Sequence, residues 1–260
     1  MKIAFYETSL SDDQWAFIEP MIPKPKKLGR PRTDPRRIID AVLYVAKGGI
    51  QWRLLPSDFP RWKTVYHVFR KWTLDHTWEA IHARLRAHVR ASVGKRAQPT
   101  AAILDSQSVK SAPHGGKVGY DAAKRIKGRK RHLLVDTLGL VLGIHVTSAD
   151  VQEREGAQEL LDHTLVWFTW LRLLWVDSGY SGSDFAQWVK SIRPELEVEV
   201  VKRTDDLKGF KVLPHRWVVE RTFGWFMRHR RLVRDYETSE SSAEAWVYIA
   251  MIRIQIRRLA

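Results

Sequence analysis

The sequence predicts an α/β protein in which an all-helical domain precedes a mixed β-sheet flanked by helices. Residues 1–93 contain four segments with helical periodicity, separated by turns rich in Pro and Gly. From residue 101 onward, short β-rich runs alternate with helical segments, which is the pattern of an α/β sandwich. The small, polar stretch GKRAQPT, residues 94–100, has the composition of a linker. We therefore predict one domain at 1–93 and a second at 101–260.

The helices of the first domain have recognisable ends. LSDDQWAFIEPMIP opens with a capping pattern, and a second helix starts at Pro35 and stops at Gly48 and Gly49. A turn marked by Gly and Pro then leads into a third helix in KTVYHVFRKWTLDHTW, and a fourth follows in EAIHARLRAHVRASV. This arrangement favours a helix-turn-helix-like DNA-binding domain, although a plain bundle with a solvated cationic face is the alternative. The polar side of the third helix carries Thr64, His67, Arg70 and Lys71.

The charge of the chain indicates a polyanionic partner. The chain holds 44 Lys and Arg against 29 Asp and Glu, a net charge of +15, and its N-terminal 97 residues hold 19 against 9. Double-stranded DNA is the partner that such an excess favours, and the basic loop PKPKKLGRPRTDPRR offers Arg30 and Arg32 as contacts. No apolar run is long enough to span a bilayer, so we expect no membrane partner. The absence of cysteine fits a cytoplasmic, nucleoid-associated protein.

The second domain is predicted from its alternating segments. AAILD is a strand candidate, and HLLVDTLGLVLGIHVT contains two β-rich runs joined by Asp-Thr-Leu-Gly, a hairpin pattern. LRLLWVDSGYSG and LEVEVVK supply two further strands, and REGAQELLDHTL and SDFAQWVKSI supply helices between them. Two more helices are expected around RWVVERTFGWFM and in SSAEAWVYIAMIRIQIRRL. Within the first of these, Trp217, Phe223 and Phe226 are expected to anchor the helix in the core.

Three acidic residues are candidates for a metal site. Asp105 and Asp177 each end a predicted strand, and Glu220 lies on a helix expected to pack on the sheet. If the two strands are neighbours, their carboxylates emerge together and repel each other unless a cation lies between them. Hard oxygen ligands suit Mg²⁺ or Mn²⁺, whereas no motif for zinc or for an organic cofactor is present. Taken singly, each acid also has a structural explanation, as a turn cap, an Asx-turn or an ion-pair partner.

The chain resembles the insertion sequence 5 family of bacterial DDE transposases over essentially its whole length. The resemblance rests on the segment from ILDSQSVK to QEREGAQELL, on WVDSGYSG and on RWVVERTFGWFMRHRRLVRDYE, with further similarity in the N-terminal helices. It implies a ribonuclease-H-like fold in which Asp105, Asp177 and Glu220 form the DDE triad and hold two Mg²⁺ or Mn²⁺ ions. It also implies binding of terminal inverted repeats, followed by DNA cleavage and strand transfer by at least a homodimer on DNA.

The chain departs from the pattern of related transposases around its last acid. Relatives carry Tyr seven residues before the Glu, Arg four before and Lys seven after; here Arg216 matches, but Leu213 and Met227 occupy the outer positions. Arg228 is the adjacent cation. Glu153 and Glu155 stand where relatives often have Asp, and we assign them no catalytic role. Two alternatives follow: a nuclease that cuts without joining, and a non-catalytic DNA-binding protein derived from a transposase.

Two basic segments are candidates for DNA contacts beside the triad. The stretch GYDAAKRIKGRKRH is expected to hold backbone phosphates, or else to form a solvated hairpin tip. Its cations are Lys124, Arg125, Lys127, Arg129, Lys130 and Arg131. The second segment is expected to line the other side of the DNA path with Arg216, Arg228, Arg230 and Arg231.

Overall fold

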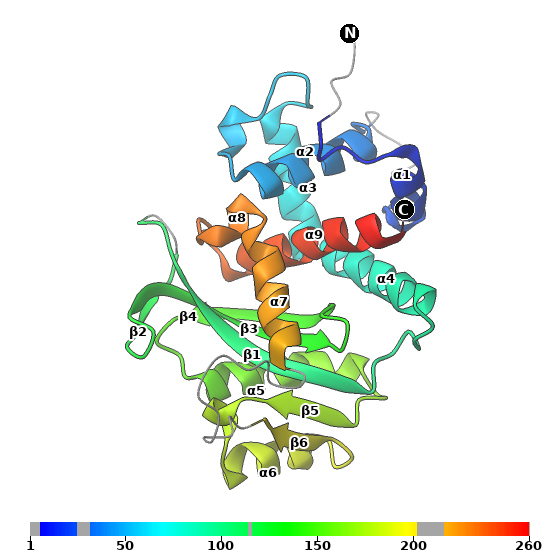
Figure 1. Ribbon diagram of the computed structural model, residues 1–260. Coiled ribbons are helices and arrows are strands. Elements are labelled where there is room, and N and C mark those ends of the chain that lie inside the picture. The colour runs from blue at the N-terminus through cyan, green and yellow to red at the C-terminus, as the bar shows by residue number, and fades with distance from the viewer. Residues whose placement is uncertain (1–5, 25–31, 114–115, 202–215, 260) are drawn as a thin grey trace. The chain divides into compact units, whose positions relative to one another are not determined.

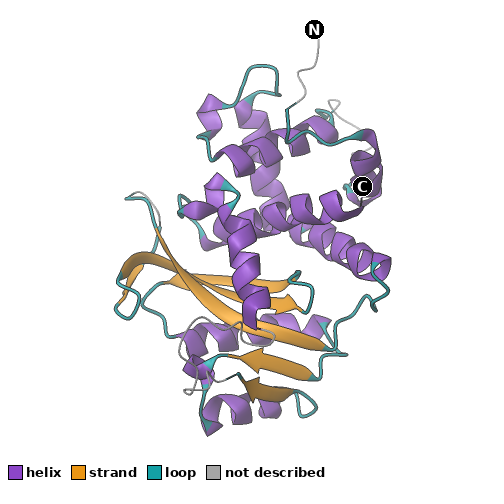
Figure 2. Ribbon diagram, viewed as in Figure 1, coloured by secondary structure: helices purple, strands orange, loops and turns teal. Residues whose placement is uncertain are grey.

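The computed structural model describes residues 6–24, 32–113, 116–201 and 216–259, and these form two compact units (Figure 1). The helical unit combines Met1–Lys95 with Phe226–Arg234 and Ser241–Ala260, and the sheet unit comprises Arg96–Trp225 and Asp235–Glu240. All described strands belong to the sheet unit (Figure 2). The predicted division near residues 94–100 therefore separates the first helices from the sheet, but the last two helices group with the N-terminal ones instead of with residues 101–225.

The helical unit contains the four predicted N-terminal helices and two C-terminal ones. Ser11 begins α1 with a capping box to Gln14, and Gly49, at φ 68°, ends α2, as the sequence predicted. The predicted third helix is divided, because Asp75 and His76 form a turn between α3 and α4. The elements are α1 (Asp12–Ile18), η1 (Glu19–Met21), α2 (Pro35–Gly48), η2 (Trp52–Leu54), α3 (Trp62–Leu74), α4 (Thr77–Ser92), α8 (Arg230–Val233) and α9 (Glu240–Leu259).

The last helix of the chain supplies the aromatic centre of the helical unit. Trp246 of α9 is fully buried and stacks on Phe69 of α3, with 4.7 Å between the ring centroids. Trp52 approaches the same indole at 5.6 Å. Nearby, Arg70 donates a hydrogen bond of 2.9 Å from its guanidinium to the Ser242 hydroxyl. The N-terminal helices therefore complete their core with a segment that lies about 170 residues further along the chain.

The sheet unit contains a mixed six-stranded sheet, which confirms the predicted fold class. Its strand order is β2-β3-β1-β5-β6, with β4 paired to β3. The pairs that involve β3 are antiparallel, and β1, β5 and β6 run parallel to one another. The elements are β1 (Ala101–Lys110), β2 (Gly119–Asp121), β3 (Ile126–Asp136), β4 (Val141–Ser148), α5 (Glu153–Thr164), η3 (Leu165–Trp167), β5 (Leu173–Val176), η4 (Ser178–Tyr180), α6 (Ser183–Ile192), β6 (Glu197–Val200) and α7 (Arg216–Met227).

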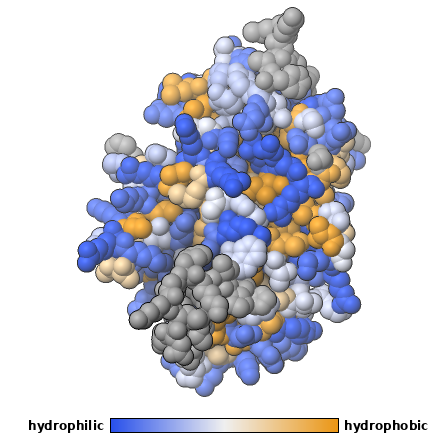
Figure 3. Space-filling view, viewed as in Figure 1, coloured by the Kyte–Doolittle hydropathy of each residue, from blue (hydrophilic) through white to orange (hydrophobic). Residues whose placement is uncertain are grey.

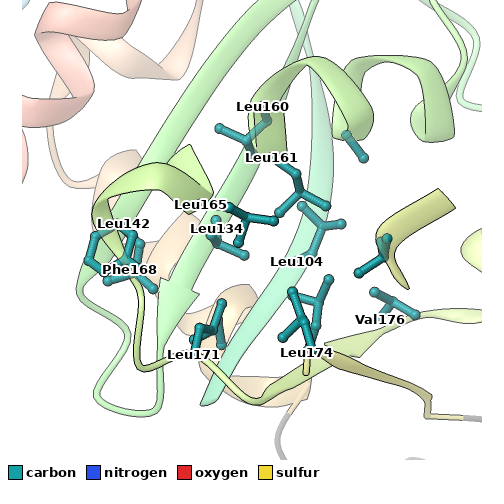
Figure 4. Packing of buried hydrophobic residues seen from close by; sticks show 14 of the residues in the cluster. Leu104, Leu134, Leu142, Leu160, Leu161, Leu165, Phe168, Leu171, Leu174 and Val176 are labelled. Carbon is teal, nitrogen blue, oxygen red and sulfur yellow. The ribbon is translucent and has the colours of Figure 1, made fainter. Parts of the chain in front are cut away.

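The core of the sheet unit lies between the sheet and α5. Leu104 of β1, Leu134 of β3 and Leu174 of β5 meet Leu160 and Leu161 of α5 in one buried cluster (Figure 4). The helix approaches the sheet closely, since a Cβ atom at Gly156 would lie only 2.1 Å from Nε2 of His132. Glycine is required there for that reason. This packing fixes the positions of β1 and β5, which are neighbouring inner strands of the sheet.

Two strands extend further than the sequence indicated. β1 continues to Lys110, so Asp105 lies inside a strand instead of at its end. β3 begins at Ile126 and contains most of the basic run, which was expected to hold backbone phosphates, with a solvated hairpin tip as the alternative. The predicted Asp-Thr-Leu-Gly hairpin between β3 and β4 is confirmed, with Gly139 at φ 78°.

The face of the molecule drawn in space-filling form (Figure 3) is mostly hydrophilic. On the face shown in Figure 3, hydrophilic side chains predominate and apolar ones form scattered patches between them. None of the helices in the described part of the chain combines the length and the hydropathy needed to span a bilayer.

Candidate active site

Asp105 lies on β1, and Asp177 directly follows β5, the parallel neighbour of β1. β1 and β5 pair in parallel register through Ala101 with Leu173 and Ile103 with Trp175. Continued two residues further, the same register brings Asp105 alongside Asp177. Side chains at matched positions of parallel strands point to the same face of a sheet, so the two carboxylates are neighbours. The expectation that these two strands are adjacent is confirmed.

Backbone amides next to each aspartate orient its carboxylate. The Ser106 N–H donates to Oδ1 of Asp105 at 2.7 Å, and the Gly179 N–H donates to Oδ1 of Asp177 at 2.9 Å. The second bond caps η4 and is the Asx-turn that the sequence indicated. These bonds restrict both side chains before any ligand is present, which is a requirement of a preorganised site.

Glu153 supplies a third carboxylate near Asp105 and Asp177, although the sequence predicted no role for it. The region around these carboxylates is called the carboxylate edge below. It begins α5, and its Oε1 accepts hydrogen bonds of 2.8 Å from the Ser106 hydroxyl and from the Lys124 ammonium. A Cβ atom at Gly179 would lie 2.8 Å from Oε2 of Glu153 and 3.0 Å from Oδ1 of Asp177, so these two acids flank the same glycine. Partial burial raises the pKa of Glu153, but the hydrogen bonds from Lys124 and Ser106 lower the pKa more, to below its ordinary value.

Tyr180 is a buried side chain that lies within reach of the charges of all three carboxylates. The side chain is 1% exposed, and burial is the main reason that its pKa lies well above the ordinary value for a phenol. The charges of Glu153, Asp105 and Asp177 raise that pKa further, because each of them disfavours a phenolate nearby. Tyr180 therefore remains a neutral phenol beneath the carboxylate edge.

Glu220 is an exposed residue of α7, a helix whose other residues attach it to the sheet unit. Val219 and Phe223 are buried, whereas Glu220 is exposed. The Thr222 hydroxyl donates to the Gly139 carbonyl oxygen at 2.9 Å, which attaches α7 to the β3–β4 hairpin. This arrangement leaves the carboxylate on the outward side of α7.

Trp217 does not anchor α7 in the core, contrary to the prediction, because it is 41% exposed. It lies instead over the guanidinium of Arg221, 4.4 Å from its ring centroid, and Trp225 lies 4.7 Å from the same group. Residues four apart share one side of a helix, so these three form a single aromatic and cationic stripe. Phe223 and Phe226 are buried, as expected.

The oxygen ligands at this edge suit a hard divalent cation. Carboxylates are the ligands that Mg²⁺ and Mn²⁺ prefer, and Asp105 and Asp177 present two of them side by side. The described residues contain no group of three or more Asp, Glu, His or Cys side chains close enough together to hold a metal ion. Glu220 is thus not gathered with the two aspartates into one cluster. Leu213 lies outside the described residues.

Three cations predicted to contact DNA are buried, which corrects that expectation. The exposed fractions of Arg129, Lys130 and Arg131 are 1%, 5% and 1%. Arg129 pairs with Asp235 at 3.0 Å and donates to the carbonyl oxygens of Glu237 and Thr238, each at 2.9 Å. Lys130 donates to the Val151 carbonyl oxygen at 2.6 Å. Burial lowers the pKa of the Arg131 guanidinium to about 10. These side chains hold the sheet unit together and are not available to phosphates.

Two further predicted contacts are engaged inside the helical unit. Arg70 is half-buried and donates to Ser242, as described above. Arg231 is half-buried; it donates to the Ile50 carbonyl oxygen at 3.2 Å and lies 5.5 Å from the ring centroid of Trp246. Both guanidinium groups therefore stabilise the packing around α9.

The remaining predicted contacts divide between exposed and undescribed positions. Thr64 is half-buried on α3, Arg216 is the first residue of α7, and Arg30 lies outside the described residues. Arg32 is exposed and donates to the Pro23 carbonyl oxygen at 2.5 Å. The exposed basic residues among the predicted DNA contacts are His67, Lys71, Lys124, Arg125, Lys127, Arg228 and Arg230.

Comparison with known proteins places the chain in a family. Residues 96–254 match the family model described as "Transposase DDE domain", and residues 10–82 match the model described as "Putative transposase of IS4/5 family". The chain is 30% identical over 117 residues to "Insertion element IS402 uncharacterized 16.2 kDa protein" of Burkholderia cepacia, an alignment that covers 42% of this chain and 78% of the relative. It is 29% identical over 120 residues to "Uncharacterized protein y4sN" of Sinorhizobium fredii, covering 46% and 86%.

The matched regions account for both units of the structure. The DDE model covers the whole mixed sheet, whose fold is therefore ribonuclease-H-like, together with most of α9. The second model covers α1 to α3 and the start of α4. Because the DDE model matches more than half of the chain and the second model matches its N-terminal region, the chain belongs to the DDE transposases of the IS4/5 family.

Proposed function

We propose that this transposase cleaves DNA at the terminal inverted repeats of an insertion sequence and joins the freed ends to target DNA. Asp105, Asp177 and Glu220 are the catalytic residues of this proposal. The observation that carries it is the parallel register of β1 and β5, which makes Asp105 and Asp177 neighbours. The DDE family match supports the reaction class.

The three carboxylates are proposed to hold two divalent cations. Bound between Asp105, Asp177 and Glu220, two Mg²⁺ or Mn²⁺ ions would activate the attacking oxygen and neutralise charge on the leaving oxygen. The chain contributes the restraint of these ligands, through the Ser106 and Gly179 amides.

The proposed chemistry is two successive in-line phosphoryl transfers. In the first, a water oxygen bonds to phosphorus as the P–O3′ bond breaks, which yields a 3′-hydroxyl and a 5′-phosphate. In the second, that 3′-hydroxyl bonds to a phosphorus of the target strand and expels another 3′-oxygen. Neither step needs a protein nucleophile, and positioning and charge stabilisation supply most of the catalysis.

The two units would share the task of binding DNA. The exposed side of α3, with His67 and Lys71, is proposed to contact the repeat as a helix-turn-helix-like element. Lys127 on β3, together with Arg228 and Arg230, would contact backbone phosphates without reading sequence. Since two ends must be joined, the acting species is proposed to be a homodimer or a larger oligomer on DNA.

The test is cleavage of a duplex that carries the inverted repeat flanking the gene, assayed with the full chain in Mg²⁺. Asp105→Asn is expected to lower cleavage and joining by about 1,000-fold or more, because loss of metal-held charge stabilisation costs several kcal/mol. Affinity for the repeat should be nearly unchanged. Asp162→Asn, which alters an exposed aspartate of α5, is the matched control and should retain activity.

Three outcomes would separate the alternatives. An Asp105→Asn protein that still cleaves in Mg²⁺ would refute the assignment of this residue. Hydrolysis by the unaltered chain without a joined product would indicate a nuclease. Binding without metal-dependent nicking would indicate a non-catalytic DNA-binding protein derived from a transposase.

A further inference from the structure

Lys124 is a surface lysine whose backbone and side chain are both fixed. It lies in the turn between β2 and β3, where its N–H donates to Oδ1 of Asp121 at 3.0 Å. Asp121 is 6% exposed, and its Oδ2 accepts a hydrogen bond of 2.5 Å from the Ser108 hydroxyl of β1. The following residue, Arg125, has a φ of 53°, the left-handed conformation that closes the turn. The turn is therefore attached to the strand that carries Asp105.

The ammonium group of Lys124 reaches back to the carboxylate edge. It donates to Oε1 of Glu153 at 2.8 Å and lies 3.3 Å from the Ser106 hydroxyl and 3.4 Å from the Ser106 carbonyl oxygen. Ser106 directly follows Asp105, and Glu153 flanks Gly179 together with Asp177. A single positive charge is thus placed beside the residue that follows Asp105 and on the glutamate that flanks Gly179 together with Asp177.

A plain surface ion pair does not account well for this arrangement. Exposed pairs contribute about 0–1 kcal/mol to stability, and their long side chains are usually not restrained at both ends. Here the lysine side chain is 37% exposed and the glutamate side chain 28%, so the pair is partly shielded from solvent without being buried. An ammonium has three N–H donors and behaves as a compact point charge, which suits it to a non-bridging phosphate oxygen.

We propose that Lys124 is a further catalytic residue, which contacts a non-bridging oxygen of the scissile phosphate, and that Glu153 is the positioning residue that holds it. The inference rests on the proposed function, because it needs DNA at the edge formed by Asp105 and Asp177. In the transition state, negative charge on the phosphoryl oxygens is stabilised by a preorganised cation. Glu153 holds the ammonium beside Ser106, the residue that follows Asp105.

The experiment compares charge-removing and charge-keeping substitutions in the full chain. Lys124→Met keeps the aliphatic stem and removes the charge, Lys124→Arg keeps a charge, and Glu153→Gln removes the charge that holds the ammonium. Lys190→Met, at an exposed lysine of α6, is the matched control. The probe is the repeat duplex with either a normal phosphodiester or a neutral methylphosphonate at the scissile position. Cleavage rate at saturating DNA, binding against salt without metal, and thermal unfolding are measured.

A phosphate contact predicts a specific pattern. Lys124→Met should lower the cleavage rate about 10–100-fold, the value of one charge-assisted hydrogen bond, and Lys124→Arg should recover most of it. In metal-free binding, Lys124→Met should reduce the slope of log affinity against log salt by about one phosphate contact. On the methylphosphonate duplex, the unaltered chain and Lys124→Met should bind equally. Glu153→Gln should lower the cleavage rate less than Lys124→Met, since the ammonium is retained but no longer held.

Several results would overturn the proposal. If Lys124→Met matches Lys190→Met in cleavage rate and salt slope while Asp105→Asn abolishes cleavage, the role of Lys124 is wrong and the proposed function stands. A second result is that Lys124→Met cleaves slowly but keeps the normal salt slope, and still differs from the unaltered chain in its affinity for the methylphosphonate duplex. In that case Lys124 acts only through the structure of the carboxylate edge. If the melting temperature of Lys124→Met falls and Lys124→Arg restores stability without restoring cleavage, a structural role is shown instead.

Discussion

The helical unit and the sheet unit use their basic side chains in opposite ways. On α3 of the helical unit, His67 and Lys71 project into solvent, and Arg70 alone of that group turns inward to Ser242. On β3 of the sheet unit, Arg129, Lys130 and Arg131 are all buried, and Lys127 is exposed near the start of the strand. A basic run in the sequence therefore indicates a DNA contact only where the element leaves the charges in solvent.

The two units also differ in how the chain assembles them. The sheet unit is nearly continuous, from Arg96 to Trp225, with one short segment added at 235–240. The helical unit gathers three separate segments, and its aromatic centre at Trp246 comes from the last of them. The helical unit consequently depends on a distant segment for its core, while the sheet unit depends on its short added segment for one buried ion pair. The following predictions test these two dependences.

Removal of residues 241–260 should have the largest effect. Without α9, Phe69 and Trp52 lose the indole against which they pack, so we expect the N-terminal helices to lose cooperative unfolding and DNA binding. In the full chain, Trp246→Ala should destabilise the helical unit by about 3–5 kcal/mol, the usual cost of truncating a buried tryptophan. Chemical denaturation monitored by circular dichroism measures this, and limited proteolysis identifies the unit that opens.

Trp167→Ala is the control for that comparison. Trp167 is 71% exposed, so its truncation should change the free energy of unfolding by about 0.5 kcal/mol or less. A fragment of residues 1–95 that folds stably and binds repeat DNA would show that the helical unit does not depend on α9.

Substitution of Arg129 should have a comparable or slightly smaller effect on the sheet unit. Arg129→Met leaves Asp235 buried without its cation, which typically costs about 3–5 kcal/mol. A double substitution, Arg129→Met with Asp235→Leu, should recover much of the loss, because no unpaired charge remains buried. Thermal and chemical unfolding give the free energies.

Lys127→Met sharpens the same comparison on the same strand. Since Lys127 is exposed, the change in stability should be within about 0.5 kcal/mol, while the salt slope of DNA binding should fall by about one contact. A stability loss for Lys127→Met as large as that for Arg129→Met would contradict the distinction between buried and solvated cations.

In the helical unit, Asp40 should produce a smaller effect than Trp246, and a pH-dependent one. Burial raises its pKa from 3.8 to about 6, although the Leu10 N–H and Arg36 oppose that rise. The native state therefore binds more protons than the unfolded state between about pH 4 and 6, so stability is lost as pH rises through this range. Asp40→Asn keeps an acceptor for the Leu10 N–H and should remove this dependence. The free energy of unfolding of Asp40→Asn, relative to that of the unaltered chain, should therefore be roughly 1–3 kcal/mol higher at pH 7 than at pH 4.

The measurement is urea unfolding of the full chain at several pH values, with Asp162→Asn as the control at an exposed position. A difference between Asp40→Asn and the unaltered chain that stays constant from pH 4 to 7 would mean that Asp40 does not titrate as its burial implies.

The two aspartates of the proposed site were predictable from local patterns. Asp105 and Asp177 were found because an acid follows an apolar β run, and the parallel register of β1 and β5 confirms their proximity. Lys124 was predicted only as one of several phosphate contacts in a basic run, and Glu153 was assigned no catalytic role. The sequence contains no local signal that joins Glu153 to Lys124, 29 positions away, since the contact depends on how α5 and the β2–β3 turn are brought to β1.

The sequence by itself determined the helices of the N-terminal region, the mixed sheet, the β3–β4 hairpin and the two aspartates, because hydrophobic periodicity and turn residues act over a few positions. Only the tertiary structure decided that Arg129 is buried against Asp235, 106 positions away, and that α9 completes the core of the helical unit. The physical reason is that burial of a charge or an indole depends on partners from distant segments, and a residue's own neighbours in sequence do not specify them.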